Sequence, residues 1–186
     1  MICGMATDTL PEPWRSFLAD IDAAAPEDLT LHCIGGFAVS LYYGLSRPTG
    51  DLDVVEVAPR TARWLSDTAG RNSALHRKHK LYVQVVTVAT LPESYAARLT
   101  EMFPGVFRRI RLLVLDPYDL ALSKLSRNLE LDLDDVKHLA KVRGLDLGVL
   151  ESRYRHELRP YVFGPVERHD RTLALWIDTI REDRGY

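Results

Sequence analysis

The chain has 186 residues, of which 46% are apolar and 27% are charged. This length fits one domain, or a core with a small lobe, and the apolar content excludes wholesale disorder. Lys and Arg number 24 against 26 for Asp and Glu, so the net charge is −2. That balance excludes a strongly basic DNA-packaging protein and an acidic tail protein, although it leaves room for a local basic patch.

The two cysteines, Cys3 and Cys33, are too few for a disulfide framework or a four-cysteine zinc site. Cys33 lies in an apolar run, where we expect a buried thiol. The first residues contain no basic region followed by an apolar stretch, and no run approaches the roughly 18 apolar residues of a membrane span. We therefore expect a cytoplasmic protein without a signal peptide.

The first third of the chain predicts a helix, a strand and a second, short helix. Large apolar residues at helical spacing predict a helix that ends before Pro26; they are Trp14, Phe17, Leu18 and Ile21. Residues 31–34 form a short apolar run, which predicts a buried strand. A tight turn at Gly35 and Gly36 follows, and residues 37–43 predict a short helix.

Further strands are expected between residues 51 and 115. Residues 51–57 alternate acidic and apolar side chains, which is typical of a half-buried strand. Residues 60–70 predict a helix. Residues 81–88 are rich in β-branched side chains and give the clearest strand prediction, and residues 111–115 predict another.

After residue 115 the pattern becomes helical. Asp116 is expected to cap a helix with Pro117 at its first position, and Asp132 to cap another. Two further helices are predicted from apolar stripes at helical spacing; these are Leu150, Tyr154 and Leu158, and Leu173, Trp176, Ile177 and Ile180. We therefore predict an α+β fold with a mixed sheet and flanking helices over residues 1–115 and a helical C-terminal lobe over residues 116–186, packed as one compact unit.

Two features between residues 35 and 53 indicate chemistry. A glycine pair between a strand and a helix exposes backbone N–H groups that suit a phosphate, although such a pair is also an ordinary tight turn. Asp51 and Asp53 are two apart on a predicted strand, so both carboxylates point to one face. Charges so close together repel unless a cation neutralises them, and Mg²⁺ suits carboxylate oxygens. The alternative is a solvated strand face.

Taken together, this segment resembles the nucleotidyltransferase superfamily, which has the DNA-polymerase-β-like fold. The hallmark of that family is a glycine pair that opens a helix, followed by a strand with Asp-x-Asp. The form Arg47-x-Thr49-x-Asp51-Leu-Asp53 is similar to the AbiEii/MenT-type toxin group. Many family members carry Gly-Ser where this chain has Gly35 and Gly36. The resemblance implies that Arg47 and Thr49 face the active site and contact nucleotide phosphates.

A later segment is similar to the same group, with a lysine, an arginine and then two aspartates at the start of the next helix. In this chain they are Lys124, Arg127, Asp132 and Asp135. Lys124 lies among apolar residues, so its ammonium has to snorkel, pair with an acid such as Asp135, or meet a ligand anion. The resemblance implies that Lys124 neutralises the nucleotide phosphates, with Arg127 and Asp135 beside it. Both aspartates also suit the first turn of a helix without any chemistry.

One departure from the family pattern concerns the third carboxylate that nucleotidyltransferases often supply from a later strand. Residues 81–88 contain no carboxylate, and Gln84 is the only strongly polar residue inside that run. The general base is therefore unassigned, with Asp53 or a metal-bound water as the candidates.

Three groups of basic residues suggest a surface for RNA phosphates, although each also fits an ordinary solvated face. They are Arg77, Lys78, His79 and Lys80; Arg108, Arg109 and Arg111; and Arg153, Arg155 and Arg159. The histidines have no metal-ligand spacing. No Ser-His-Asp pattern and no Walker-type phosphate loop is present.

The sequence therefore predicts a Mg²⁺-dependent nucleotidyltransferase that moves a nucleoside monophosphate from a nucleoside triphosphate to an acceptor hydroxyl. Asp51, Asp53 and Lys124 are the predicted catalytic residues, and Asp51 and Asp53 are the predicted metal ligands. The resemblance implies the 3′ end of tRNA as acceptor, a toxin role and a cognate antitoxin as partner. The alternatives are a small-molecule or protein acceptor, or an inactive nucleotide-binding module.

Overall fold

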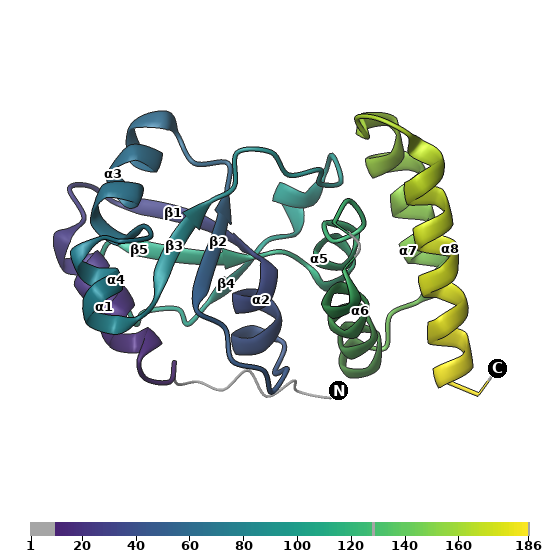
Figure 1. Cartoon of the computed structure of the whole chain (residues 1–186), viewed down its shortest axis with the longest axis horizontal. Coiled ribbons are helices and arrows are strands. Elements are labelled where there is room, and N and C mark those ends of the chain that lie inside the picture. Colours follow the sequence, from purple (N-terminus) through teal and green to yellow (C-terminus); the bar gives the residue numbers. More distant parts are fainter. Residues whose placement is uncertain (1–9, 128, 186) are drawn as a thin grey trace. The chain divides into compact units, whose positions relative to one another are not determined.

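The computed structural model describes residues 10–127 and 129–185 and confirms the predicted α+β fold (Figure 1). The chain divides into two compact units. The first comprises Met1–Val88 and Leu99–Leu115, and the second comprises Ala89–Arg98 and Asp116–Tyr186. Residues 89–98, which the sequence prediction includes in the span 1–115, join the second unit through their contacts.

A five-stranded mixed sheet forms the centre of the first unit (Figure 1). Its strands are β1 (Leu29–Ile34), β2 (Asp51–Val55), β3 (Tyr82–Val85), β4 (Thr100–Met102) and β5 (Ile110–Val114), in the order β3-β2-β1-β5-β4. Strand β1 pairs antiparallel with β2 and parallel with β5, while β2 pairs parallel with β3 and β4 pairs antiparallel with β5. The carboxyl end of β1 therefore lies beside the DLD segment of β2.

The sheet is stabilised by apolar side chains at alternating positions, as period-two strands require. In β1, Leu31 and Cys33 are fully buried, and in β5 Ile110, Leu112 and Val114 are buried. Burial raises the pKa of the Cys33 thiol, in agreement with the expected buried cysteine. Cys3 lies outside the described residues.

Helices α1 (Trp14–Ala24), α3 (Pro59–Ala69) and α4 (Ala74–His79) complete the first unit with the turn helix α2 described below. The four apolar residues predicted for the inner face of α1 are all buried. Helix α4 was not among the elements predicted from the sequence, and it contains three members of the first basic group, Arg77, Lys78 and His79. The Ser73 hydroxyl accepts a hydrogen bond from the His76 N–H at 3.0 Å, and the basic side chains of the last turn suit the negative end of the helix dipole.

Several element boundaries differ from the sequence prediction, among them those of the short helix and of the third strand. The short helix begins at the glycine pair, as α2 (Gly35–Phe37), and continues as a π-helical turn, η1 (Ala38–Tyr42). The strand predicted over residues 81–88 covers only Tyr82–Val85. Strand β3 is at the edge of the sheet, and its single partner β2 ends at Val55. The Val86 N–H still donates to the Val54 carbonyl oxygen at 2.8 Å, but the residues after Val86 lie beyond the end of β2 and have no strand with which to pair. Val88 is accordingly 85% exposed.

The second unit is helical. It contains η2 (Tyr95–Arg98), α5 (Pro117–Leu122), α6 (Glu130–Arg143), α7 (Leu147–Arg153), η3 (Tyr154–Leu158), η4 (Arg159–Tyr161) and α8 (Val166–Asp183). Asp116 caps α5 as predicted, because its carboxylate accepts hydrogen bonds from the Tyr118 and Asp119 N–H groups at 2.9 and 3.0 Å. The apolar stripe predicted for the last helix is buried in α8.

The start of α6 corrects the prediction that Asp132 is its cap. The helix begins at Glu130, so Leu129 occupies the cap position and Asp132 lies in the first turn. The Asp132 carboxylate still reaches back and accepts a hydrogen bond from the Leu129 N–H at 2.9 Å. Its local role is therefore that of the acid in a capping box, three residues after the cap.

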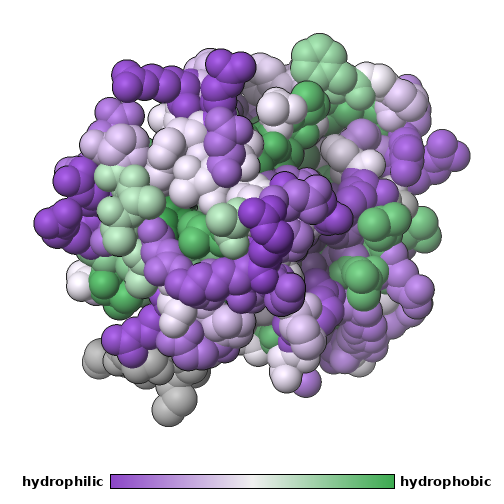
Figure 2. Space-filling view, turned by 60° about the vertical axis from the view of Figure 1, so that its left-hand side comes forward, coloured by the Kyte–Doolittle hydropathy of each residue, from purple (hydrophilic) through white to green (hydrophobic). Residues whose placement is uncertain are grey.

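The molecular surface is mixed in character. Figure 2 shows one face, on which hydrophilic side chains surround separate hydrophobic patches. Within residues 10–127 and 129–185, no helix combines the length and the apolar character that crossing a membrane demands.

Candidate active site

The turn from β1 into α2 lies directly against the acidic strand β2. Gly35 has a φ of +70°, a left-handed conformation that glycine adopts without strain. A Cβ on Gly35 would lie 2.3 Å from Asp53 Oδ2, and a Cβ on Gly36 would lie 3.2 Å from Thr49 Oγ1. The contact at Gly35 leaves no room for a side chain unless Asp53 moves, whereas the contact at Gly36 is tight and requires Thr49 to shift by a few tenths of an ångström.

Asp51 and Asp53 lie on one face of β2, as predicted from their spacing. Ile34 is the register partner of Asp53 in β1, which places the second carboxylate beside the end of β1 and the turn that follows it. Both aspartates are half-buried. The geometry therefore brings two acidic groups to the same place as the exposed backbone of the glycine turn.

The Asp51 carboxylate is held by hydrogen bonds on both of its oxygens. The Thr49 hydroxyl donates to Oδ1 at 3.2 Å, and the Tyr82 hydroxyl donates to Oδ2 at 3.3 Å. A carboxylate oxygen has two lone pairs, so each oxygen keeps one for a cation. Tyr82 is not among the site residues predicted from the sequence, although the period of two in its strand places it on the same face as Gln84.

Arg47 completes this cluster. Its Nη2 would lie 4.0 Å from a Cβ on Gly36, which places the guanidinium beside the glycine turn. The structure thus brings together every site residue that was predicted in the first unit. They are Gly35, Gly36, Arg47, Thr49, Asp51 and Asp53.

No third acidic group joins the two aspartates among the residues that the structure describes, which contain no cluster of three or more His, Cys, Asp or Glu able to hold a metal ion. Gln84 is the register partner of Asp53 across the parallel pairing of β2 and β3. Two carboxylates with a neighbouring amide oxygen are hard oxygen donors, which suit a Mg²⁺ ion that keeps several of its waters. The donor set therefore fits Mg²⁺ held by Asp51 and Asp53.

The predicted site residues of the second unit form a buried ionic cluster. Lys124 is only 4% exposed, and its Nζ lies 2.7 Å from Asp135 Oδ2 and 3.7 Å from Asp132 Oδ1. Arg127 donates two hydrogen bonds to Asp132, at 3.0 and 2.5 Å. Burial alone raises the pKa of the Asp132 carboxyl, but the hydrogen bonds from Arg127 and the Leu129 N–H, together with the charge of Lys124, lower it below its usual value.

Comparison with known proteins shows which family the chain belongs to. The chain matches the model of a family described as "Nucleotidyltransferase of unknown function (DUF6036)" over residues 15–182. It belongs to this family. No curated protein and no solved structure matches the chain. The chain is therefore a nucleotidyltransferase, a class that uses nucleoside triphosphates and is typically metal-dependent.

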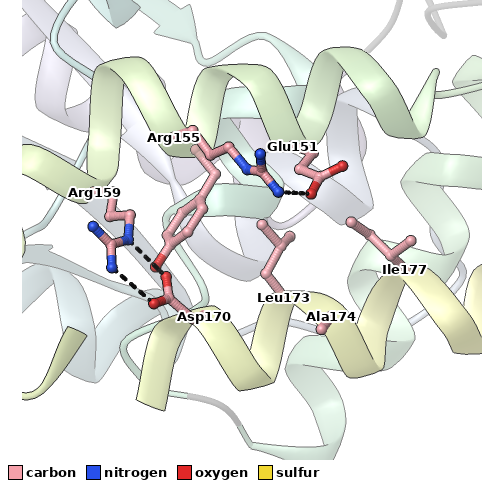
Figure 3. Close-up of a pocket in the computed structure, with 8 residues that line it drawn as sticks. Glu151, Arg155, Arg159, Asp170, Leu173, Ala174 and Ile177 are labelled. Carbon is pink, nitrogen blue, oxygen red and sulfur yellow. Dashed lines mark hydrogen bonds and ion pairs between the residues drawn. The ribbon is translucent and has the colours of Figure 1, made fainter. Parts of the chain in front are cut away.

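Several of the basic residues that suggested an RNA-binding surface in this nucleotidyltransferase are paired with acids of their own unit. Ion pairs with nearby carboxylates are formed by Lys78, Arg111, Arg153, Arg155 and Arg159. Figure 3 shows Arg155 beside Glu151 and Arg159 beside Asp170, at the rim of a cavity of about 520 Å³ between the helical segment 151–159 and α8. These pairs reduce the positive potential that the sequence alone suggested for an RNA-binding surface.

Proposed function

We propose that this protein transfers a nucleoside monophosphate from a nucleoside triphosphate to an acceptor hydroxyl, with Mg²⁺ held by Asp51 and Asp53. The observation that carries the proposal is the approach of Gly35 to Asp53, at which a Cβ would lie 2.3 Å from the carboxylate. It joins backbone suited to phosphate and carboxylates suited to a cation in one place. Family membership supplies the reaction class.

The chain's own residues have distinct roles in this proposal. The backbone N–H groups of Gly35 and Gly36 bind phosphate oxygens, and the Arg47 guanidinium offers a bidentate contact to the triphosphate. Thr49 holds Asp51 through its hydroxyl, 3.2 Å from Oδ1. When bound, Mg²⁺ neutralises charge that develops on the transferring phosphoryl group.

The reaction itself is an in-line displacement at phosphorus. The acceptor oxygen forms a bond to the α-phosphorus, and the bond from that phosphorus to the pyrophosphate oxygen breaks. The proton of the acceptor hydroxyl passes to Asp53 or to solvent, and pyrophosphate leaves. Most of the rate gain is expected from positioning and charge stabilisation, as in other phosphoryl transfers.

For the second unit, the proposal assigns Lys124 to the triphosphate, with Arg127 and Asp135 beside it. This assignment rests on the resemblance in sequence. The contact of Lys124 Nζ with Asp135 Oδ2, 2.7 Å long and buried, supports the alternative that the pair stabilises the helical unit. Lys124 has to exchange this partner for phosphate if it binds nucleotide.

The acceptor that the resemblance supports is the 3′ end of tRNA. The form Arg47-x-Thr49-x-Asp51-Leu-Asp53, similar to the AbiEii/MenT-type toxin group, is the basis for this part of the proposal. A toxin that modifies tRNA in the cytoplasm would be controlled by a cognate antitoxin protein, which is the proposed partner.

Two other functions are favoured by specific observations. The ion pairs of Arg111, Arg155 and Arg159 favour a small-molecule or protein acceptor, because these side chains already neutralise carboxylates. Gln84 beside Asp53, in place of a carboxylate, favours an inactive nucleotide-binding module.

Incubation with Mg²⁺, total tRNA and each α-labelled nucleoside triphosphate in turn tests the proposal. Asp51→Ala and Asp53→Ala are the matched variants, and thermal unfolding confirms that both are folded. Label on tRNA that both variants lose supports the proposed reaction and identifies the nucleotide. Label on the protein itself or on a small molecule would identify that molecule, and not tRNA, as the acceptor. Metal-dependent nucleotide binding without any labelled product supports the inactive module.

A further inference from the structure

Tyr82 begins β3 directly opposite Asp51, in the parallel pairing of β2 and β3. Its hydroxyl oxygen lies 3.3 Å from Asp51 Oδ2. The Arg71 guanidinium lies over the Tyr82 ring, 4.6 Å from its centroid, and the His76 ring packs edge-on at 5.3 Å. The tyrosine is therefore held on its ring as well as at its hydroxyl.

The direction of the hydrogen bonds follows from the chemistry of the three groups. Arg71 Nη2 lies 2.6 Å from the Tyr82 hydroxyl oxygen, and a guanidinium has only donors. The Tyr82 oxygen must therefore accept from Arg71, which leaves the hydroxyl proton for Asp51. Because the carboxylate can only accept, the two hydrogen bonds run in one direction, with Arg71 donating to Tyr82 and Tyr82 donating to Asp51.

This arrangement determines how the Asp51 carboxylate is turned. Thr49 donates to Oδ1 and Tyr82 donates to Oδ2, so rotation of the carboxylate about its terminal bond breaks both hydrogen bonds. Groups that orient a metal ligand in this way are commonly worth about 10- to 100-fold in metal affinity. Because Arg71 donates to the Tyr82 hydroxyl oxygen, the hydroxyl proton stays directed at the carboxylate.

We propose that Tyr82 is a positioning residue for Asp51, and that Arg71 orients the Tyr82 hydroxyl for this role. The inference rests on the proposed function, because it takes Asp51 as a metal ligand. It adds two residues from outside the segment 35–53, one on the edge strand and one in the loop between α3 and α4. Neither residue touches the transferred group.

Mn²⁺ titration of the purified protein followed by electron paramagnetic resonance tests the inference without turnover. Tyr82→Phe keeps the ring that packs against Arg71 and His76 and removes the hydroxyl, so we expect Mn²⁺ affinity to fall about 10-fold or more. Tyr118→Phe is the matched control. Tyr118 also carries an arginine over its ring, Arg153 at 4.7 Å, but it belongs to the second unit. The Tyr118→Phe variant should bind Mn²⁺ with the affinity of the wild type.

Arg71→Met provides the second variant. It should weaken Mn²⁺ binding less than Tyr82→Phe does, and it should have no further effect when Tyr82 is already Phe, because both act through the same hydroxyl. Additive losses, or wild-type affinity in Tyr82→Phe, would overturn the inference while leaving the metal site in place. Asp51→Asn distinguishes a failure of the proposed metal site from a failure of the positioning role of Tyr82. If it binds Mn²⁺ as the wild type does, the proposed metal site is wrong and the inference fails with it.

Discussion

Gln84 and Asp53 face each other across the parallel pairing of β2 and β3, at the position where a further carboxylate would complete an acidic site. Register partners in a sheet share a face, so an acid at position 84 would point to the same side as Asp53. The edge strand thus already presents a polar side chain next to the two aspartates.

Gln84→Glu should therefore increase the affinity of the site for Mn²⁺. An additional negative charge about 4 Å from a divalent cation contributes roughly 2 kcal/mol in water, which corresponds to about 30-fold in affinity. Thr87→Glu adds the same charge at an exposed position beyond the strand and is the control. Equal affinity in both variants would show that position 84 does not face the cation.

The approach of Gly35 to Asp53 leads to a second prediction. Gly35→Ala forces an L-residue into a left-handed conformation, which costs about 1–2 kcal/mol, and also drives its Cβ into the Asp53 carboxylate. Gly44→Ala has the same backbone penalty, with a φ of +75°, but nothing lies within 4 Å of its Cβ. Both variants should lose stability in urea unfolding, whereas only Gly35→Ala should lose transfer activity. Parallel losses of activity would refute a specific role for the glycine turn.

Lys124 and Asp135 lead to a prediction about stability. Lys124→Met leaves two buried carboxylates without their ammonium partner, so we expect a loss of about 3–5 kcal/mol of unfolding free energy. Lys124→Met combined with Asp135→Leu should recover much of it. Lys137→Ala removes a lysine from an exposed pair with Asp183, 2.8 Å long, and should lower the unfolding free energy far less than Lys124→Met does.

The double variant at 124 and 135 then separates the two roles of the lysine. If Lys124 neutralises the triphosphate, the stabilised double variant should have a raised KM for the nucleotide. A KM equal to that of the wild type would restrict Lys124 to the packing of the helical unit.

A fourth prediction concerns pH and Asp22, whose carboxylate accepts hydrogen bonds from the N–H groups of Arg108, Arg109 and Ile110 at 3.2, 2.6 and 2.9 Å. Burial raises the pKa of this carboxyl, but these backbone donors outweigh it and the net pKa is lowered. A lowered pKa in the folded state means that the stabilisation is complete above the unfolded value of about 3.9 and is lost as pH falls through the folded value.

Asp22→Asn should therefore be less stable than the wild type at neutral pH, and the difference should shrink on acidification below about pH 4. Urea unfolding from about pH 3 to pH 7 measures both free energies. Asp67→Asn, at an exposed position on α3, is the control for removing one carboxylate. A difference that stays constant across this range would contradict the role of the charged form.

Local patterns in the sequence were enough to predict the acidic strand, the buried face of α1 and the cap of α5 at Asp116. Each depends on residues within a few positions of one another, through side-chain periodicity or a hydrogen bond to a nearby N–H group. The cluster of Gly35 with Asp53 was also anticipated, because the family motif places both groups within 20 residues.

Only the tertiary structure decided which groups meet across the fold. The end of β3 at Val85 depends on the length of its partner strand, and the contact of Tyr82 with Asp51 depends on the register between them. The ion pair of Arg159 with Asp170 likewise depends on how two helical segments pack. Register and packing are set by interactions between distant segments, so no local spacing in the sequence encodes them.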